Sequence, residues 1–292
     1  MTVSAAGVQC RVDAILPGRA AVPLVATPAR MASLARALTE SVECAATPTE
    51  RPRLPLPTPY RAEVLKEDLT SRVERVHGER GTFVRKTYAP RPLFLWRTFL
   101  RPAKARREHD NLRALEAAGV PVTRALAWEE ERRFGFVPQS RLWLEDAGEV
   151  RNLKDALAAG APRTRAALLA QYAALLRALH ERGFVSLTAY PRNVVVAGGR
   201  LLLCDQPYLV RRRAPVGRAA ASIDLYDALF TPGRVRALGR SERLRALVAY
   251  AGERRAAYAL WRRLVRRPAF WQRFLKGCIK VGSRIGLWSR QP

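Results

Sequence analysis

Four polar residues, far apart in the chain, carry the side chains that phosphoryl transfer requires: Lys86, Glu108, Asn193 and Asp205. This reaction needs a cation on the nucleotide phosphates, hard oxygen ligands for Mg²⁺, and alignment of the acceptor hydroxyl. The amide oxygen of Asn193 and the carboxylate of Asp205 are ligands that suit Mg²⁺. We expect Lys86 to pair with Glu108, because an isolated carboxylate on the apolar face of a helix is costly.

The segment from Ser186 to Asn193, taken with Asp205, has the spacing of a kinase catalytic loop without its catalytic aspartate. Kinases place that aspartate five residues before a metal-binding asparagine, with a second metal-binding aspartate after a nearby strand. Here Thr188 occupies the aspartate position, and Ser186 occupies the position of the usual histidine. A threonine hydroxyl is not a carboxylate base, so we expect transfer to be slowed by roughly 10²- to 10⁴-fold, or lost.

Each of these residues also has an ordinary structural interpretation. Lys86 can be a solvated strand lysine and Glu108 an exposed helix glutamate. Asn193 and Asp205 can be turn residues. Taken together and in this chain order, the four favour the kinase interpretation. No G-x-G-x-x-G motif occurs between the first expected strands, however, and Gln206 follows Asp205 where kinases have phenylalanine.

The expected secondary structure changes from β-rich to helical along the chain. The expected strands are 64–65, 71–77, 81–88, 124–128, 141–145, 193–196 and 201–204. The expected helices are 103–118, 165–181, 223–230, 241–251 and 256–265. This order predicts an α+β, bilobal protein-kinase-like fold. Its small β-rich N-lobe, with one main helix, spans 61–146, and its larger, mostly helical C-lobe spans 147–267.

The two ends of the chain differ from this pattern. Residues 1–60 are rich in Ala, Pro and Thr, which predicts a disordered or extended tail, with Met31 as an alternative start. Residues 268–292 form a basic–aromatic segment without a single acidic residue, which suits a helix on an anionic membrane surface. A helix packed on the larger lobe with an arginine-rich outer face is the alternative.

The formal net charge of +27 has two explanations. One is a compositional bias toward Ala, Arg and Pro; the other is an anionic partner such as an acidic glycolipid, a membrane or nucleic acid. Nucleic-acid binding is the weakest hypothesis, since no recognition motif supports it. The four cysteines form no CxxC pair, which argues against zinc. With no secretory signal or long apolar run, we expect a cytoplasmic protein, peripheral on the inner membrane at most.

Several motifs resemble the lipopolysaccharide kinases of the Kdo/WaaP family. They are the run from Leu95-Trp96-Arg97 through Pro102–Glu108, then Asn111-Leu112, Ala118–Pro121, Leu179–Phe184 and Tyr190–Asn193, within residues 62–265. The resemblance implies a protein-kinase-like fold, ATP and Mg²⁺ as cofactors, and an acceptor sugar in the lipopolysaccharide inner core. It also implies the roles of four residues: Lys86 contacts the nucleotide phosphates, Glu108 pairs with this lysine, and Asn193 and Asp205 bind the metal.

The resemblance further implies that Asp224, in Ile223-Asp224-Leu225, braces the catalytic loop from a later helix; a helix N-cap is the alternative. Family members have His-x-Asp where this chain has Ser186-Leu187-Thr188. The leading hypothesis is therefore a kinase-fold protein that binds Mg-ATP and transfers phosphate weakly or not at all, as a pseudokinase does. The alternative is an active ATP-dependent kinase that phosphorylates a sugar of the lipopolysaccharide inner core or a related glycolipid.

Overall fold

The structure is a computed structural model that describes residues 8–11, 61–78, 81–211, 215–231, 238–266, 274 and 276–278. Most of the N-terminal tail and of the basic–aromatic segment therefore lies outside the described residues. The chain divides into two compact units. The first unit contains residues 1–109 and 125–146, and the second contains 110–124 and 147–292.

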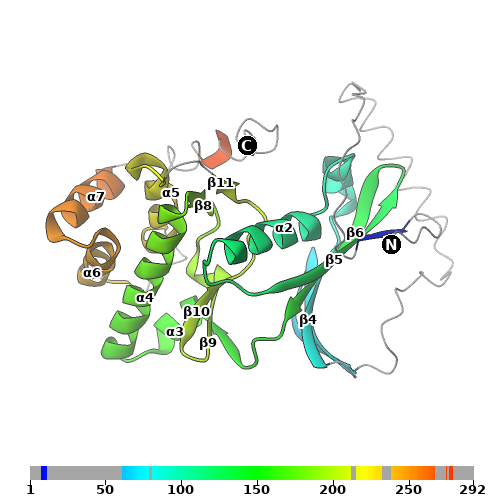
Figure 1. The fold of residues 1–292 in the computed structure, drawn as a ribbon, viewed down its shortest axis with the longest axis horizontal. Helices are drawn as coiled ribbons and strands as arrows, with labels where there is room; N and C mark the ends of the chain where they lie inside the picture. The colour runs from blue at the N-terminus through cyan, green and yellow to red at the C-terminus, as the bar shows by residue number, and fades with distance from the viewer. Residues whose placement is uncertain are drawn as a thin grey trace. The chain divides into compact units, whose positions relative to one another are not determined.

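A six-stranded antiparallel sheet forms the first unit (Figure 1). Its strands, in spatial order, are β1 (Val8–Arg11), β5 (Ala125–Arg133), β6 (Phe136–Glu145), β4 (Gly81–Tyr88), β3 (Ser71–Gly78) and β2 (Arg61–Asp68). Ser140, Leu142 and Leu144 of β6 are buried at alternate positions, as the two-residue period of a strand requires. The edge strand β2 is exposed along its length and rich in charge, which discourages pairing with a further strand.

The β5–β6 hairpin is longer than the sequence predicted. The predicted strands stop at 128 and restart at 141, because the run from Glu129 to Arg133 has no apolar alternation. Cross-strand polar contacts hold this part of the hairpin instead. Arg141 Nη1 donates to Glu129 Oε2 at 3.2 Å, and Trp143 Nε1 donates to Glu129 Oε1 at 2.8 Å. Paired side chains of this kind stabilise a sheet without apolar residues.

Helix α2 (Lys104–Ala117) lies within one residue of the prediction at each end. Just before the first residue of α2, the backbone N–H of Ala103 donates to Glu130 Oε2 at 3.2 Å. The buried Glu130 of β5 thus satisfies a backbone donor at the start of the helix. Gly119 ends the helix with a φ of +71°, which glycine adopts without strain. The 3₁₀ helix η1 (Pro92–Thr98) was not predicted.

The second unit is mostly helical. Its helices are α3 (Leu153–Ala159), α4 (Pro162–Glu181), the short 3₁₀ helix η2 (Pro191–Asn193), α5 (Arg218–Leu229), α6 (Arg240–Ala251) and α7 (Arg254–Arg266). Its strands are β7 (Val150–Asn152), β8 (Phe184–Val185), β9 (Val194–Ala197), β10 (Arg200–Leu203) and β11 (Val210–Arg211). They form two small antiparallel sheets, in the orders β10-β9-β7 and β11-β8.

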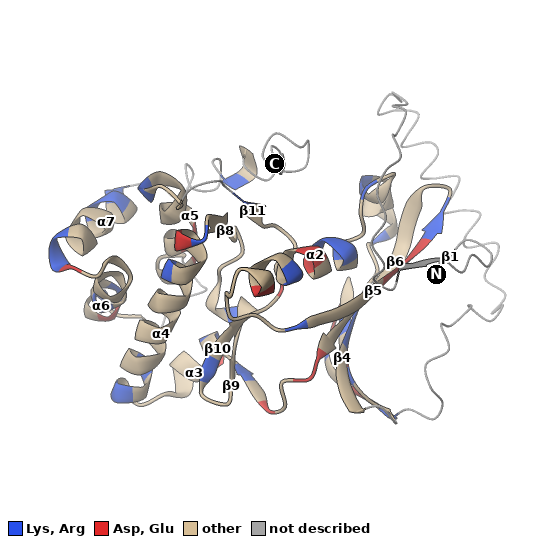
Figure 2. Cartoon of the chain, in the orientation of Figure 1, with Lys and Arg blue, Asp and Glu red and all other residues tan. Residues whose placement is uncertain are grey.

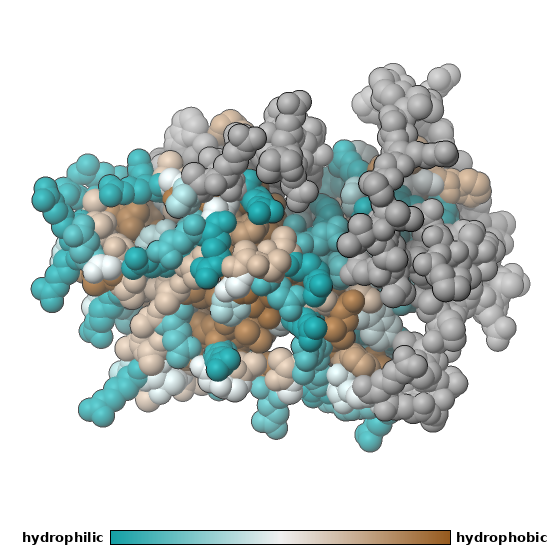
Figure 3. Space-filling model, viewed as in Figure 1, coloured by the Kyte–Doolittle hydropathy of each residue, from teal (hydrophilic) through white to brown (hydrophobic). Residues whose placement is uncertain are grey.

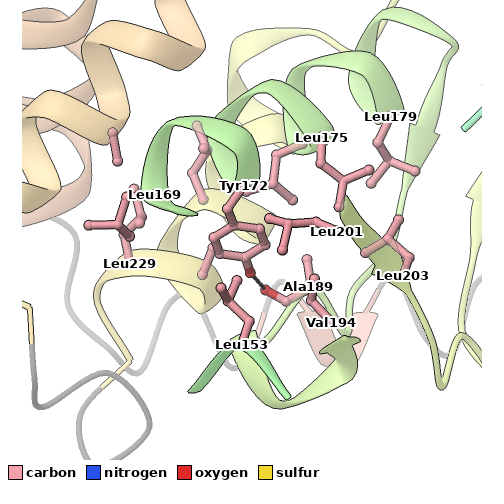
Figure 4. Packing of buried hydrophobic residues seen from close by; sticks show 14 of the residues in the cluster. Leu153, Leu169, Tyr172, Leu175, Leu179, Ala189, Val194, Leu201, Leu203 and Leu229 are labelled. Carbon is pink, nitrogen blue, oxygen red and sulfur yellow. Dashed lines mark hydrogen bonds between the residues drawn. The ribbon is translucent and has the colours of Figure 1, made fainter. Parts of the chain in front are cut away.

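The core of the second unit is built on α4, whose leucines recur at helical spacing. Figure 4 shows Leu169, Leu175 and Leu179 of α4 packed with Leu201 and Leu203 of β10. In the middle of this core the hydroxyl of Tyr172 donates to the Ala189 carbonyl oxygen at 2.6 Å. Its burial, followed by the charges of Asp224 and Asp227, raises the pKa of Tyr172 well above its ordinary value, so the phenol stays protonated as a donor. This bond ties the backbone after Thr188 to the main helix.

Lysine and arginine residues occur on most helices of both units (Figure 2). In α7 they lie opposite the buried face formed by Ala257, Leu260 and Leu264. On the face drawn in Figure 3, hydrophilic side chains project along much of the coloured surface, with apolar surface between them. Across the described residues, no helix combines the length and apolar character needed to cross a membrane.

Candidate functional site

In the first unit, the structure places Lys86 against Glu108. Lys86 and Tyr88 lie two residues apart on β4, so their side chains point to the same face of the sheet. Lys86 Nζ lies 2.8 Å from Glu108 Oε1, and the Tyr88 hydroxyl donates to Glu108 Oε2 at 2.6 Å. The glutamate is fully buried, so the ammonium and the phenol together stabilise its charge. The contribution of Tyr88 was missed from the sequence, although its two-residue spacing from Lys86 was a usable signal.

In the second unit, Asp224 holds the loop that contains Thr188. The fully buried Asp224 carboxylate accepts from the backbone N–H of Ser186 at 2.7 Å and from that of Leu187 at 2.8 Å. Leu187 has a φ of +56°, which is unusual for a bulky residue and persists only where the surroundings enforce it. Asp224 lies in the middle of α5, not at its N-cap, which is Gly217. Its contacts are those of a brace on the loop.

His180 extends this arrangement. Its Nε2 lies 3.2 Å from Asp224 Oδ2, and its Nδ1 lies 2.8 Å from the hydroxyl oxygen of Tyr250. Desolvation of the Tyr250 phenol, with smaller contributions from the Asp224 and Glu181 carboxylates, raises the pKa of Tyr250 to about 12. A chain of hydrogen bonds thus runs from α6 through α4 and α5 to the loop.

The side chain of Thr188 forms a buried polar cluster with the side chains of Ser186 and Gln206. Ser186 Oγ donates to Gln206 Oε1 at 2.5 Å, and Thr188 N donates to Ser186 Oγ at 3.2 Å. Thr188 Oγ1 lies between 3.3 and 3.4 Å from Ser186 Oγ, Gln206 Oε1 and two backbone carbonyl oxygens. Gln206 has no exposed surface, and its Nε2 donates to the Cys204 carbonyl at 2.9 Å. The hydroxyl of Thr188 is thus bonded inside the unit.

Gln206 is the main functional residue that sequence reasoning missed. The sequence showed glutamine where kinases have phenylalanine, and a buried glutamine must find polar partners. Ser186 and Thr188, which the sequence aligned with the usual histidine and aspartate of kinases, supply those partners. The three side chains therefore satisfy one another's hydrogen bonds inside the unit.

Asn193 and Asp205 emerge from the same end of the β9–β10 hairpin. Val194 pairs with Leu203 in this hairpin, and the ladder continues as Cys204 N donates to the Asn193 carbonyl oxygen at 2.9 Å. Asn193 Nδ2 donates to the Thr188 carbonyl at 2.9 Å, which turns the amide toward the loop. Asp205 has a φ of +53°, a conformation that aspartate tolerates better than most residues. These contacts bring the backbones of Asn193 and Asp205 to neighbouring positions at one end of the hairpin.

This pair of side chains fits Mg²⁺ only in part. The described residues contain no group of three or more His, Cys, Asp or Glu side chains that could hold a metal ion. Mg²⁺, however, commonly takes one or two protein ligands and fills its other positions with water and substrate phosphates. The donor set of Asn193 and Asp205 is therefore adequate for Mg²⁺ that arrives with a nucleotide, and inadequate for Mg²⁺ alone.

Two carboxylates elsewhere in the second unit, those of Glu181 and Asp224, are bonded to groups other than the Thr188 hydroxyl. Glu181 Oε1 accepts from Arg177 Nε at 2.7 Å on the helix surface. Asp224 accepts from two backbone N–H groups and contacts His180.

Asp227, one helical turn beyond Asp224, contacts Lys276 Nζ, which also contacts the Tyr190 hydroxyl. Desolvation raises the pKa of Asp227, although the charge of Lys276 opposes this shift.

A β-sheet unit with a buried lysine–glutamate pair and a helical unit with a braced loop define a protein-kinase-like fold. The solved structure of WaaP in complex with acyl carrier protein shares this fold, with a TM-score of 0.50 and 19% sequence identity over 75% of this chain and 89% of that one. Residues 66–205 match the lipopolysaccharide kinase (Kdo/WaaP) family. No curated relative matches the sequence. The predicted fold class and family are both confirmed.

Proposed function

We propose that this family member binds Mg-ATP and transfers phosphate weakly or not at all. The observation that carries the proposal is the inward hydrogen bonding of Thr188 with Ser186 and Gln206 at the position of the catalytic base. The residues that kinases use to bind nucleotide and metal are meanwhile still present. The acceptor class that the family suggests is an acidic glycolipid such as the lipopolysaccharide core, and a residual reaction would use one of its sugar hydroxyls.

Each residue has a definite part in this proposal. Lys86, oriented by Glu108, contacts the α- and β-phosphates of the nucleotide. Asn193 and Asp205 supply oxygen ligands to Mg²⁺, which would neutralise charge on the phosphates when bound. Asp224 keeps the loop in its strained conformation. Phosphoryl transfer depends mainly on positioning and charge, so loss of the base slows the reaction more readily than it abolishes nucleotide binding.

Thermal unfolding tests nucleotide binding. We expect Mg-ATP at about 100 times its Kd to stabilise the wild type by about 2.7 kcal/mol, and Mg²⁺ alone to have no effect. Lys86→Ala and Asp205→Ala should remove the stabilisation, whereas Lys154→Ala, which alters an exposed lysine on α3, should retain it. A wild type whose melting temperature is unchanged by Mg-ATP would refute the nucleotide part of the proposal.

A gain-of-function variant tests the catalytic part. The triple variant Ser186→His, Thr188→Asp, Gln206→Phe replaces the whole buried polar cluster with the residues typical of kinases. With radiolabelled ATP and purified lipopolysaccharide core, we expect the triple variant to exceed the wild type by roughly 10²- to 10⁴-fold in transfer rate. If the wild type transfers phosphate at a measurable rate that equals the rate of the folded triple variant, the alternative holds: the protein is an active kinase that works without this base.

A further inference from the structure

Five large apolar side chains are exposed on one part of the first unit. They come from η1, from the turn after it and from the tip of the β5–β6 hairpin, and we call them the η1–hairpin patch: Leu93, Phe94, Trp96, Leu100 and Phe134. The exposed fractions are 76% for Leu93, 65% for Leu100 and 83% for Phe134. Single exposed apolar residues need no explanation, but several of them on adjoining segments indicate an interaction surface.

The two segments of the patch are joined by specific contacts. Leu100 N donates to the Gly135 carbonyl at 2.9 Å, and Val137 N donates to Thr98 Oγ1 at 2.9 Å. The rings of Phe99 and Phe136 lie 4.9 Å apart beneath the surface. A Cβ atom at Gly135 would lie only 2.9 Å from the Phe99 ring, so the hairpin tip approaches the turn after η1 closely. The patch is therefore one surface on a fixed support.

Backbone strain accompanies this exposure. Leu100 has a φ of +51° and Phe134 a φ of +49°, and bulky side chains rarely adopt this left-handed conformation. Gly or Asn would occupy either position at lower cost. Folding alone gives no reason for a leucine and a phenylalanine here, because both side chains are exposed. Strain at an exposed apolar residue is consistent with a binding role for that side chain.

The η1 side of the patch is positively charged, and at the hairpin tip Arg133 is paired with Glu131. Arg91, Arg97 and Arg101 alternate with the apolar residues along the chain, and all three are exposed. The Arg97 guanidinium lies 4.5 Å from the centroid of the Phe94 ring and 5.4 Å from that of Trp96. Between Arg91 and Arg101 the chain contains no acidic residue. Aromatic and aliphatic side chains interleaved with arginine match the interface of an anionic bilayer, where the apolar groups insert and the cations meet headgroups.

We propose that the η1–hairpin patch docks the protein on an anionic lipid bilayer. The arginines attract the surface, and the side chains of Trp96, Leu100 and Phe134 enter the boundary between headgroups and acyl chains. This inference is separate from the proposed nucleotide chemistry, since it concerns the first unit alone and requires neither ATP nor a sugar acceptor. It assigns membrane binding to described residues outside the basic–aromatic C-terminal segment.

Co-sedimentation of the full chain with lipid vesicles, without nucleotide, tests the proposal. We expect binding to vesicles that contain phosphatidylglycerol and weak binding to pure phosphatidylcholine. The double variant Leu100→Gly, Phe134→Gly should lower the partition coefficient about tenfold or more, because it removes inserted apolar surface. The same substitutions relieve strained positions, so the thermal stability of the double variant should equal or exceed that of the wild type. A loss of binding therefore cannot be ascribed to unfolding.

Matched controls separate the patch from general hydrophobicity and charge. Leu69→Ser alters a leucine of comparable exposure in the β2–β3 turn. The charge-reversal variant Arg97→Glu tests the arginines of the patch, and Arg200→Glu makes the same change in the second unit. Both controls should bind as the wild type does, whereas Arg97→Glu should lose affinity for anionic vesicles several-fold. Wild-type binding that survives the glycine double variant, or a patch that binds an acidic protein and ignores vesicles, would overturn the proposal.

Discussion

At the scale of single residues, the loop at Ser186–Thr188 has a threonine where the family resemblance places a catalytic aspartate, and two buried groups hold its backbone. Asp224 still accepts from two backbone N–H groups, and Tyr172 still anchors Ala189. The sequence shows a threonine at position 188, but the hydrogen-bond partners of its hydroxyl could not be predicted from the sequence. The sequence does not show that Gln206 meets Ser186, because these residues lie 20 positions apart in the chain and their contact depends on tertiary packing.

We predict that Asp224→Asn lowers the free energy of unfolding by about 3 kcal/mol. The amide would keep one carbonyl oxygen and turn an NH₂ group toward N–H donors, which leaves buried donors without an acceptor. Urea unfolding of this variant and of Glu149→Gln, which alters an exposed acid, measures the difference. If the two variants unfold at the same urea concentration, Asp224 does not brace the loop as the hydrogen bonds indicate.

At the scale of elements, periodicity located the longer helices that carry a buried face, but it missed the short helix α3, whose Leu153 and Leu157 are buried. Helix α4 was recognisable because leucines recur along it, and α2 because Pro102 and Gly119 bound it. The charged end of β5 escaped prediction because Glu130 is buried as an acceptor for Arg132 and the Ala103 N–H, which no hydrophobic pattern reveals. The 3₁₀ helix η1 escaped because its apolar residues are exposed and follow no core-facing period.

The contact between α4 and α6 provides a prediction that depends on pH. Arg165 donates to both carboxylate oxygens of Glu242, at 2.9 and 3.0 Å, and Glu242 also accepts from the Gly239 N–H at the start of α6. The Arg165 hydrogen bond is the main cause that lowers the pKa of Glu242. An acid whose pKa is lower in the folded state stabilises the fold above its unfolded pKa and loses this contribution as the pH falls.

Glu242→Gln should therefore cost about 1 to 2 kcal/mol of unfolding free energy at pH 7, the usual value for a charge-assisted pair that is partly exposed. The difference from the wild type should shrink as the pH falls from about 5 toward 3, because both chains then present an uncharged side chain to Arg165. Denaturant unfolding across this pH range provides the measurement. A difference that stays constant with pH would mean that packing, not the ion pair, is responsible.

At the scale of the whole molecule, charge is the dominant property. The chain has 52 lysine and arginine residues against 25 acidic ones, so 27 cations have no opposite charge to balance them. Individual ion pairs such as Arg177–Glu181 are worth about 0.2 to 1 kcal/mol when exposed, and salt weakens them. Repulsion among the unbalanced cations acts over longer distances and opposes the compact state. Salt therefore lowers stability by weakening the ion pairs and raises stability by screening the repulsion.

We expect repulsion to prevail, so the urea midpoint of the full chain should rise when NaCl increases from about 0.02 M to about 0.5 M. The Debye length falls below about 10 Å above 0.1 M salt, which screens charges spread over the surface more completely than contacts within 3 Å. The rise should level off near the upper concentration, as screening saturates. Sodium sulfate, which also strengthens apolar burial, should add a further rise without saturation. A midpoint that falls with NaCl would show that local ion pairs outweigh the net charge, and would make an anionic partner unnecessary for relieving self-repulsion.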